Sequence, residues 1–148
     1  DSTVLALANV YGPRQDAAGL GEAGVVSIFA RKLLAGQGCT IFGDGNQTRD
    51  FVYVDDVVEA FVAAGSAKGP VGLGNVGTGV ETTVNDLHAA MARLTKSRVK
   101  PVYAPARKGE LARSALDSSY LRSALGWTPT TSLTDGLAAT LDWFGRLA

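Results

Sequence analysis

One stretch of the sequence decides the fold: Gly43-Asp44-Gly45-Asn46-Gln47-Thr48-Arg49-Asp50-Phe51-Val52-Tyr53-Val54-Asp55-Asp56-Val57. Glycine, aspartate and asparagine favour turns, so residues 43–47 are predicted to form a turn. The aromatic and β-branched run that follows predicts a strand over residues 48–54. A helix is predicted over residues 56–67, with Asp55 as its N-cap. The buried face of that helix is predicted to consist of Val57, Val58, Phe61 and Val62.

Helical and strand patterns alternate over the rest of the chain, which predicts the α/β class. The other predicted strands are residues 4–9, Thr40–Phe42, residues 71–76 and residues 99–103. A loop is predicted over residues 15–21, followed by a helix over residues 22–35 that ends at Gly36. Three later helices are predicted from signals at their ends. Capping boxes of Thr83 with Asp86 and of Ser132 with Asp135 each predict a helix N-terminus. Asp117 is predicted to cap the start of a third helix, which ends at Gly126.

The overall composition excludes several classes of function. The 148 residues include 14 basic and 14 acidic side chains, so no broad positive field indicates nucleic acid or an anionic membrane as a partner. No apolar run approaches the roughly 20 residues of a membrane helix. Cys39 and His88 are the single cysteine and histidine, which excludes a disulfide framework, disfavours a structural metal site and agrees with a reducing cytoplasm. A neutral chain can still hold a local cationic pocket for a small phosphorylated ligand.

Two cationic segments are candidates for binding such a ligand. Arg49 begins the predicted strand, and its planar guanidinium can donate two parallel hydrogen bonds to a phosphate. The segment Pro105-Ala106-Arg107-Lys108-Gly109-Glu110-Leu111 offers Arg107 for a phosphate and Glu110 for the hydroxyls of a ribose. The alternatives are a surface arginine paired with Asp44 or Asp50, and a solvated charged loop. Spacing alone leaves both alternatives open.

Further motifs stand in a fixed order along the chain. They are Asn9-Val10-Tyr11-Gly12-Pro13-Arg14-Gln15, Gly21-Glu22-Ala23-Gly24-Val25-Val26, Asn75-Val76-Gly77-Thr78-Gly79, Leu125-Gly126-Trp127-Thr128-Pro129 and Gly136-Leu137. Together with residues 43–57 they resemble the nucleotide-sugar epimerases of the extended short-chain dehydrogenase family over essentially the whole chain. Within that family, Arg14-Gln15 and residues 47–54 are more similar to the 4-epimerases than to the dTDP-glucose 4,6-dehydratases.

The resemblance implies roles for the two cationic segments. The positions of Arg49, Arg107 and Glu110 are those at which the family holds the diphosphate and ribose of its substrate. The family typically has Arg-Pro-Gly-Asp or Arg-Pro-Gly-Glu at the second segment, and Lys108 replaces that proline here. The cationic and acidic residue types are nevertheless retained.

The resemblance also implies contacts from other segments. Asn9 matches an asparagine that contacts the substrate, and Leu7 matches a position that lines the nicotinamide. The backbone at Gly24 and Val25 is expected to pack on the nucleotide. Ile41 and Phe42 are expected to meet the uracil.

The family's catalytic machinery is absent from the sequence. No G-x-x-G-x-x-G follows a strand at the start of the chain, and no Tyr-x-x-x-Lys pair occurs: the residues four positions after the tyrosines are Gln15, Val57, Arg107 and Ala124. We therefore expect residues 1–148 to be one domain, the C-terminal substrate-binding part of a Rossmann-type extended short-chain dehydrogenase. The N-terminal half, which is expected to bind NAD, would lie outside this chain, and the fragment alone is expected to be inactive.

The resemblance implies an activity for the intact enzyme. It is expected to interconvert UDP-galactose and UDP-glucose through a 4-keto intermediate, and homodimers are common in the family. One alternative is another NAD-dependent nucleotide-sugar epimerase or a dehydratase similar to dTDP-glucose 4,6-dehydratase. A second alternative is a non-catalytic nucleotide-binding domain.

Overall fold

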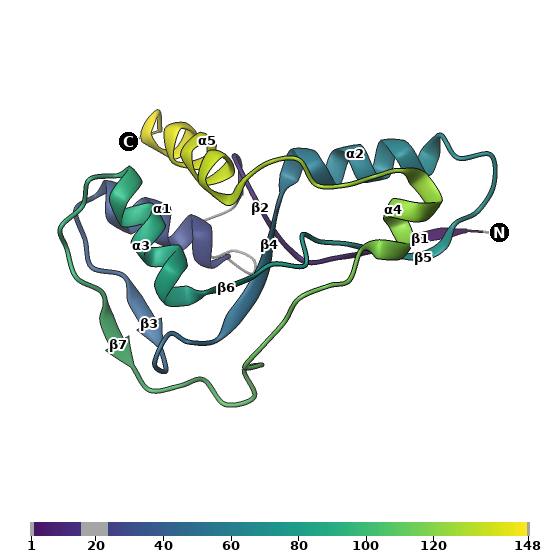
Figure 1. The fold of residues 1–148 in the computed structure, drawn as a ribbon. Coiled ribbons are helices and arrows are strands. Elements are labelled where there is room, and N and C mark those ends of the chain that lie inside the picture. The colour runs from purple at the N-terminus through teal and green to yellow at the C-terminus, as the bar shows by residue number, and fades with distance from the viewer. Residues whose placement is uncertain (1, 16–23, 148) are drawn as a thin grey trace.

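A computed structural model of the protein describes residues 2–15 and 24–147. Their strands are β1 (Thr3–Leu7), β2 (Asn9–Tyr11), β3 (Thr40–Phe42), β4 (Thr48–Tyr53), β5 (Gly72–Val76), β6 (Glu81–Thr83) and β7 (Val102–Ala104). Their helices are α1 (Val25–Leu34), α2 (Val54–Gly65), α3 (Val84–Leu94), α4 (Ser119–Leu125) and α5 (Leu133–Gly145). Figure 1 shows α1, α3 and α5 grouped on one side of β4, with α2, α4, β1 and β5 on the other. The α/β class is confirmed.

The strands of the described residues form three small sheets rather than one continuous sheet. β1 pairs with β5 in parallel, β2 pairs with β4 in parallel, and β4 pairs with β6 antiparallel. A third, two-stranded parallel sheet joins β3 to β7. The strand predicted over residues 4–9 is divided at Ala8, whose N–H still donates to Val76 O at 2.9 Å. The chain changes its partner strand at this residue, which a pattern of apolar side chains cannot show.

The larger of the two cores lies between α1, α3, α5 and one face of β4. Side chains alternate along a strand, so Arg49, Phe51 and Tyr53 share this face of β4. Tyr11 packs edge-to-face on Phe51 and Tyr53, with ring centroids 6.3 and 5.6 Å apart. Helix α5 approaches this aromatic cluster closely because position 136 is glycine: an added Cβ would overlap the Tyr11 hydroxyl.

The smaller core lies on the other face of β4, where Val52, Val57, Ala60, Val76, Leu121 and Trp127 pack together. The predicted inner face of α2 is wrong. Val57 is buried as expected, but Val58, Phe61 and Val62 are 51%, 54% and 55% exposed. Helix α2 turns Asp56, Val57 and Ala60 inward instead, because Asp56 makes hydrogen bonds to a distant loop.

Most helix ends follow the local signals in the sequence. Thr83 Oγ1 and Ser132 Oγ accept from the N–H groups of Asp86 and Asp135, at 2.9 and 3.1 Å, which confirms both predicted caps. Gly36 lies just past the end of α1, as predicted, with φ of 67°. Gly126, at φ 68°, ends α4 as predicted.

Other predicted boundaries differ from the structure. Asp55 is not the N-cap of α2: the helix begins at Val54, after an extended Tyr53, so Asp55 lies in its first turn. Asp117 accepts from the N–H of Ser119 at 2.9 Å, but the N-cap position of α4 is Ser118. The strand predicted over residues 99–103 is β7, Val102–Ala104, and β6 was not predicted. The predicted loop over residues 15–21 and helix start at Glu22 lie largely outside the described residues.

Candidate functional site

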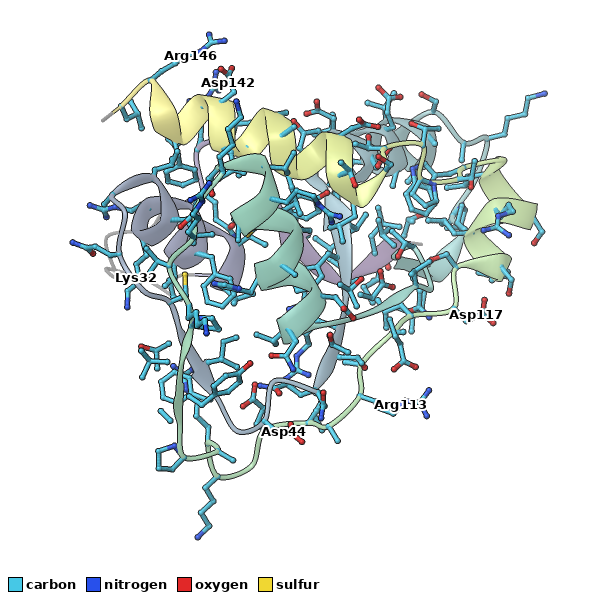
Figure 2. All side chains as sticks on the ribbon, turned by 60° about the vertical axis from the view of Figure 1, so that its left-hand side comes forward. Lys32, Asp44, Arg113, Asp117, Asp142 and Arg146 are labelled. Atoms are coloured by element: carbon cyan, nitrogen blue, oxygen red, sulfur yellow. The ribbon has the colours of Figure 1, made fainter. Side chains whose placement is uncertain are left out.

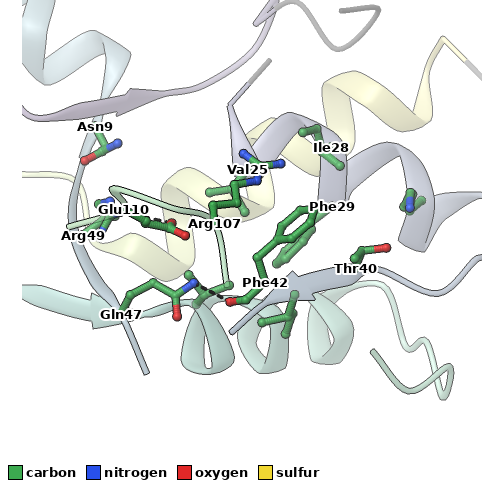
Figure 3. A pocket seen from close by; sticks show the side chains of 13 residues that line it. Asn9, Val25, Ile28, Phe29, Thr40, Phe42, Gln47, Arg49, Arg107 and Glu110 are labelled. Atoms are coloured by element: carbon green, nitrogen blue, oxygen red, sulfur yellow. Dashed lines mark hydrogen bonds and ion pairs between the residues drawn. The ribbon is translucent and has the colours of Figure 1, made fainter. Parts of the chain in front are cut away.

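A cavity of about 410 Å³ opens where α1, β3, β4 and the loop after β7 meet. Figure 3 shows side chains from these four segments converging on it. Seven of the nine predicted site residues line the cavity: Asn9, Val25, Ile41, Phe42, Arg49, Arg107 and Glu110. Segments that are far apart in the sequence therefore meet around one space large enough for part of a small ligand.

The two remaining predicted residues lie beside or away from the cavity. Gly24 is the N-cap of α1 and directly precedes the cavity residue Val25. Leu7 ends β1, is 42% exposed, and does not line the cavity. The structure thus brings Gly24 to the edge of the site and leaves Leu7 outside it.

Arg49 is held firmly at the cavity wall. Its Nη1 donates to Thr48 O at 2.7 Å and to Leu111 O at 2.8 Å, and its Nη2 lies 3.2 Å from Glu110 Oε1. The side chain is only 18% exposed. Pairing of Arg49 with Asp44 or Asp50, the alternative left open by the sequence, does not occur. An arginine fixed by two carbonyls and one carboxylate presents its charge in a defined place, as anion binding requires.

Arg107 also lines the cavity and is stacked on an aromatic ring. Its guanidinium carbon is 4.0 Å from the centre of the Phe42 ring, a cation–π distance. Phe42 ends β3, and its carbonyl accepts from Gln47 Nε2 at 2.9 Å, which closes the turn over residues 43–47 (Figure 3). This turn was correctly predicted, and it sets the position of the ring that supports Arg107.

The N-terminus of α1 lies beside this region, and its N-cap residue Gly24 makes no side-chain hydrogen bond to the helix. The first amides of an α-helix have no partner inside the helix, and Gly24 has no side chain to cap them. Such a terminus attracts anions through its N–H groups and its dipole. Val25 in the first turn lines the cavity, so the amide end of α1 is near it.

Sequence reasoning missed other lining residues, namely Ile28, Phe29, Lys32, Thr40, Gln47 and Val84. The sequence contained a signal for three of these residues, Ile28, Phe29 and Lys32. Positions 25, 28, 29 and 32 recur at helical spacing, so the helix that presents Val25 also presents Ile28, Phe29 and Lys32 to the same side.

The charge of the cavity lining favours an anion. Lys32, Arg49 and Arg107 are cationic and Glu110 is anionic, which leaves a formal charge of 3 − 1 = +2. Other charged side chains are spread over the surface, as the labelled Arg113, Asp117, Asp142 and Arg146 show in Figure 2. In the part of the chain that the structure describes, no three His, Cys, Asp or Glu side chains gather as a metal ion would require.

None of the helices in the described residues is long and apolar enough to cross a membrane.

Comparison with known proteins gives a consistent family assignment. The profile of the NAD dependent epimerase/dehydratase family matches residues 1–77. A UDP-glucose 4-epimerase of Mycolicibacterium smegmatis is 52% identical over 147 residues, which cover 97% of this chain and 45% of that protein. The chain spans about half the length of the relatives it matches.

Two solved structures have the same fold. The UDP-glucose 4-epimerase of Thermotoga maritima with UDP-glucose superposes with a TM-score of 0.92 at 48% identity, covering 98% of this chain and 46% of that one. The UDP-glucuronic acid 4-epimerase of Bacillus cereus, in complex with UDP-glucuronic acid and NAD, superposes with a TM-score of 0.90 at 30% identity, covering 99% and 46%.

Proposed function

Because this chain belongs to the NAD dependent epimerase/dehydratase family, we propose that it is the UDP-sugar-binding part of a UDP-glucose 4-epimerase. One observation carries the proposal: a cavity with a formal charge of +2 is lined both by the apolar Ile41 and Phe42 and by the cationic Arg49 and Arg107. A nucleoside diphosphate has the matching groups, an aromatic base followed by an anion.

The proposed contacts follow from this order. The uracil lies against Ile41 and Phe42, and the diphosphate lies between Arg49 and Arg107, near the amides at Gly24 and Val25. A guanidinium binds a phosphate through two parallel hydrogen bonds, which makes an arginine pair a strong anchor.

The ribose is proposed to lie at Glu110, with Asn9 further along the substrate. A carboxylate has two oxygens, so Glu110 can keep its contact with Arg49 through Oε1 while accepting from a ribose hydroxyl through Oε2. An asparagine amide can both donate to a phosphate and accept from a hydroxyl, which suits the position of Asn9 at the cavity.

The chain's own part in the proposed reaction is to anchor the non-reacting end of the substrate. Binding energy from a remote group can hold a substrate while its reacting part turns, as a 4-epimerase requires. Neither Tyr11 nor Tyr53 suits the role of base: burial raises the pKa of both phenols, so they stay neutral at physiological pH.

NAD would supply the hydride acceptor and donor of the reaction, and Leu7 is the one residue of this sequence predicted to contact it. Leu7, exposed at the end of a parallel strand, offers one apolar contact. We therefore propose that NAD is bound mainly by an N-terminal Rossmann half of the same protein.

An exposed apolar face of α2 supports such a partner half. Val58, Phe61 and Val62 are each more than half exposed along this helix. Within the described residues, β1 pairs only with β5, so its other edge is free to extend the sheet. We propose that the NAD-binding half packs here, and that the intact enzyme is a cytoplasmic homodimer.

The diphosphate anchor is tested by UDP affinity in the natural protein. Arg49→Ala and Arg107→Ala are each expected to weaken UDP binding by about 1.5–3 kcal/mol, the loss of a charge-assisted hydrogen bond. Arg113→Ala is a matched control, because Arg113 pairs with Glu81 outside the cavity. Unchanged affinity for UDP in both cavity variants would reject the anchor.

The activity is tested by product analysis. NMR of UDP-galactose incubated with the natural, NAD-loaded protein is expected to show UDP-glucose. If UDP-galactose is unchanged while UDP-glucuronic acid or another nucleotide sugar is converted, the protein is a different epimerase of the same family, as the similarity to the Bacillus cereus enzyme allows. No conversion of any nucleotide sugar, with UDP still bound, would favour a non-catalytic nucleotide-binding domain.

A further inference from the structure

Asp50 is a buried carboxylate that the proposed UDP contacts do not use. It is 1% exposed and follows Arg49 on β4, with its side chain on the opposite face of the strand. Oδ1 accepts from the N–H and the hydroxyl of Thr78 at 2.9 and 2.5 Å. Oδ2 accepts from the N–H of Gly79 at 3.0 Å and of Leu116 at 3.2 Å. Four donors satisfy the charge, which makes its burial tolerable.

The Leu116 contact connects Asp50 to the loop that carries Arg107 and Glu110. This loop, residues 105–117, runs from β7 to α4 without a regular element and is mostly exposed. Three successive residues of β4 hold it. Thr48 N–H donates to Ala112 O at 2.9 Å, Arg49 binds Leu111 O and Glu110, and Asp50 binds the N–H of Leu116.

Asp50 is the most buried of the three β4 residues that hold the loop. The Arg49 contacts are partly exposed and involve groups that the substrate would also bind, so they can change when UDP enters. The Asp50 contact lies behind the strand and away from the cavity, where it can persist in both states. A loop without secondary structure opens easily unless such contacts hold it.

Asp56 provides an internal comparison. It is 4% exposed, and Oδ1 accepts from the N–H and the hydroxyl of Thr130 at 3.0 and 3.1 Å. Oδ2 accepts from the N–H of Thr131 at 3.1 Å. The pattern repeats that of Asp50 with Thr78 and Gly79, but the loop that Asp56 holds does not line the cavity.

We propose that Asp50 is a positioning residue for the nucleotide site: through Leu116 it holds the loop so that Glu110 reaches Arg49 and Arg107 lines the cavity. This inference rests on the proposed function. Loss of the Asp50 carboxylate therefore weakens UDP binding and lowers the stability of the fold, whereas loss of the Asp56 carboxylate lowers the stability alone.

The test compares Asp50→Ala, Asp56→Ala and Leu116→Pro in the natural protein. Leu116→Pro removes the one N–H that joins the loop to Asp50 and keeps the other three donors, so it carries the test if Asp50→Ala does not fold. Melting temperature, UDP affinity by calorimetry and amide hydrogen exchange of residues 107–115 are measured for each variant.

The expected result separates the two aspartates. Asp50→Ala and Leu116→Pro raise the Kd for UDP by about tenfold, the equivalent of one lost hydrogen bond, and speed exchange in the loop. Asp56→Ala lowers the melting temperature and leaves the Kd within about twofold of the unsubstituted protein, well under the tenfold that one hydrogen bond is worth. In the Asp50→Ala background, Arg107→Ala costs less affinity than it does alone, because the arginine is already displaced.

Two results would overturn the inference. If folded Asp50→Ala or Leu116→Pro binds UDP as the unsubstituted protein does, the loop does not depend on Asp50, and the proposed function still stands. If Asp56→Ala weakens UDP binding as much as Asp50→Ala, the effect is one of general stability. An unsubstituted protein that does not bind UDP would instead refute the proposed function itself.

Discussion

Helices α1 and α2 both have apolar residues at helical spacing, but they lie in opposite surroundings. Phe29 on α1 is 1% exposed, packed among α3 and α5 beside the cavity. Phe61 on α2 is 54% exposed on the far side of β4. The comparison shows that one side of the molecule is closed around a site, while the other keeps an apolar surface uncovered. A helix with apolar residues on both faces is typical of one that is covered on both.

The largest expected effect is on the free energy of unfolding, compared between a substitution in the larger core and one on the exposed face of α2. Leu87→Ala, at a fully buried position of α3, is expected to lower the free energy of unfolding by about 2–5 kcal/mol, because it leaves a cavity in the larger core. Phe61→Ala is expected to change it by no more than about 0.5 kcal/mol in the 148-residue chain. Urea unfolding measures both.

The same pair of variants also tests the partner half. In the natural protein, Phe61→Ala is expected to become as destabilising as a core substitution, about 3–5 kcal/mol, if α2 is covered there. Equal small effects in both proteins would mean that the outer face of α2 stays in water.

A second prediction concerns the aromatic support of Arg107. Phe42→Ala removes the ring on which the guanidinium stacks, and the proposed surface for uracil with it. UDP binding is expected to weaken by about 1–2 kcal/mol, the scale of a partly desolvated cation–π contact. Tyr103→Ala on the neighbouring strand β7 is the control, since Tyr103 does not line the cavity. Calorimetry showing equal losses for the two variants would argue against a specific role of Phe42.

A third prediction concerns His88, which packs edge-to-face on Phe29 at 5.6 Å and whose Nε2 has no hydrogen-bond partner in the described residues. Burial lowers the pKa of His88 below its ordinary 6.5. As the pH falls, His88 therefore takes up its proton in the unfolded chain before it does so in the folded one. The free energy of unfolding is at its full value above pH 6.5 and decreases as the pH drops below it. One proton can change this free energy by no more than about 1.4 kcal/mol per pH unit.

His88→Leu is expected to flatten this dependence between pH 7 and pH 5, measured by urea unfolding at each pH. A steep dependence that survives the substitution would assign the titration to other groups.

The smallest expected effect lies on the surface. Hydrogen bonds from Arg113 and Thr48 lower the pKa of Glu81 to about 2 from its ordinary 4.5. The stability that this carboxylate contributes is therefore present above pH 4.5 and is lost as the pH falls toward 2. Thermal melting of Glu81→Gln against the unsubstituted protein is expected to differ slightly at pH 6 and to converge at low pH. A difference that grows on acidification would contradict the assignment.

Local features of this fold could be predicted from sequence. Thr83 and Ser132 cap helices through residues three positions away, and the turn over residues 43–47 closes through Gln47 and Phe42. These contacts depend on near neighbours alone. The residues that line the cavity were predictable mainly because the motifs resemble a known family.

Long-range contacts could not be predicted in this way. The outward turn of α2 depends on Asp56 meeting Thr130, 74 positions later, and the loop is held by Asp50 meeting Leu116, 66 positions later. Aspartates at these positions resemble helix caps or surface charges in the sequence. Their burial becomes evident only when the distant donors are in place.

The most direct test of the account is an amide chemical-shift titration of the isotope-labelled natural protein with UDP. We expect saturable shifts at Phe42, Arg49 and Glu110, and unchanged signals at Val58 and Phe61 on α2. Shifts at α2 with none at the cavity, or no saturable shifts at all, would contradict the claim that this cavity holds the nucleotide.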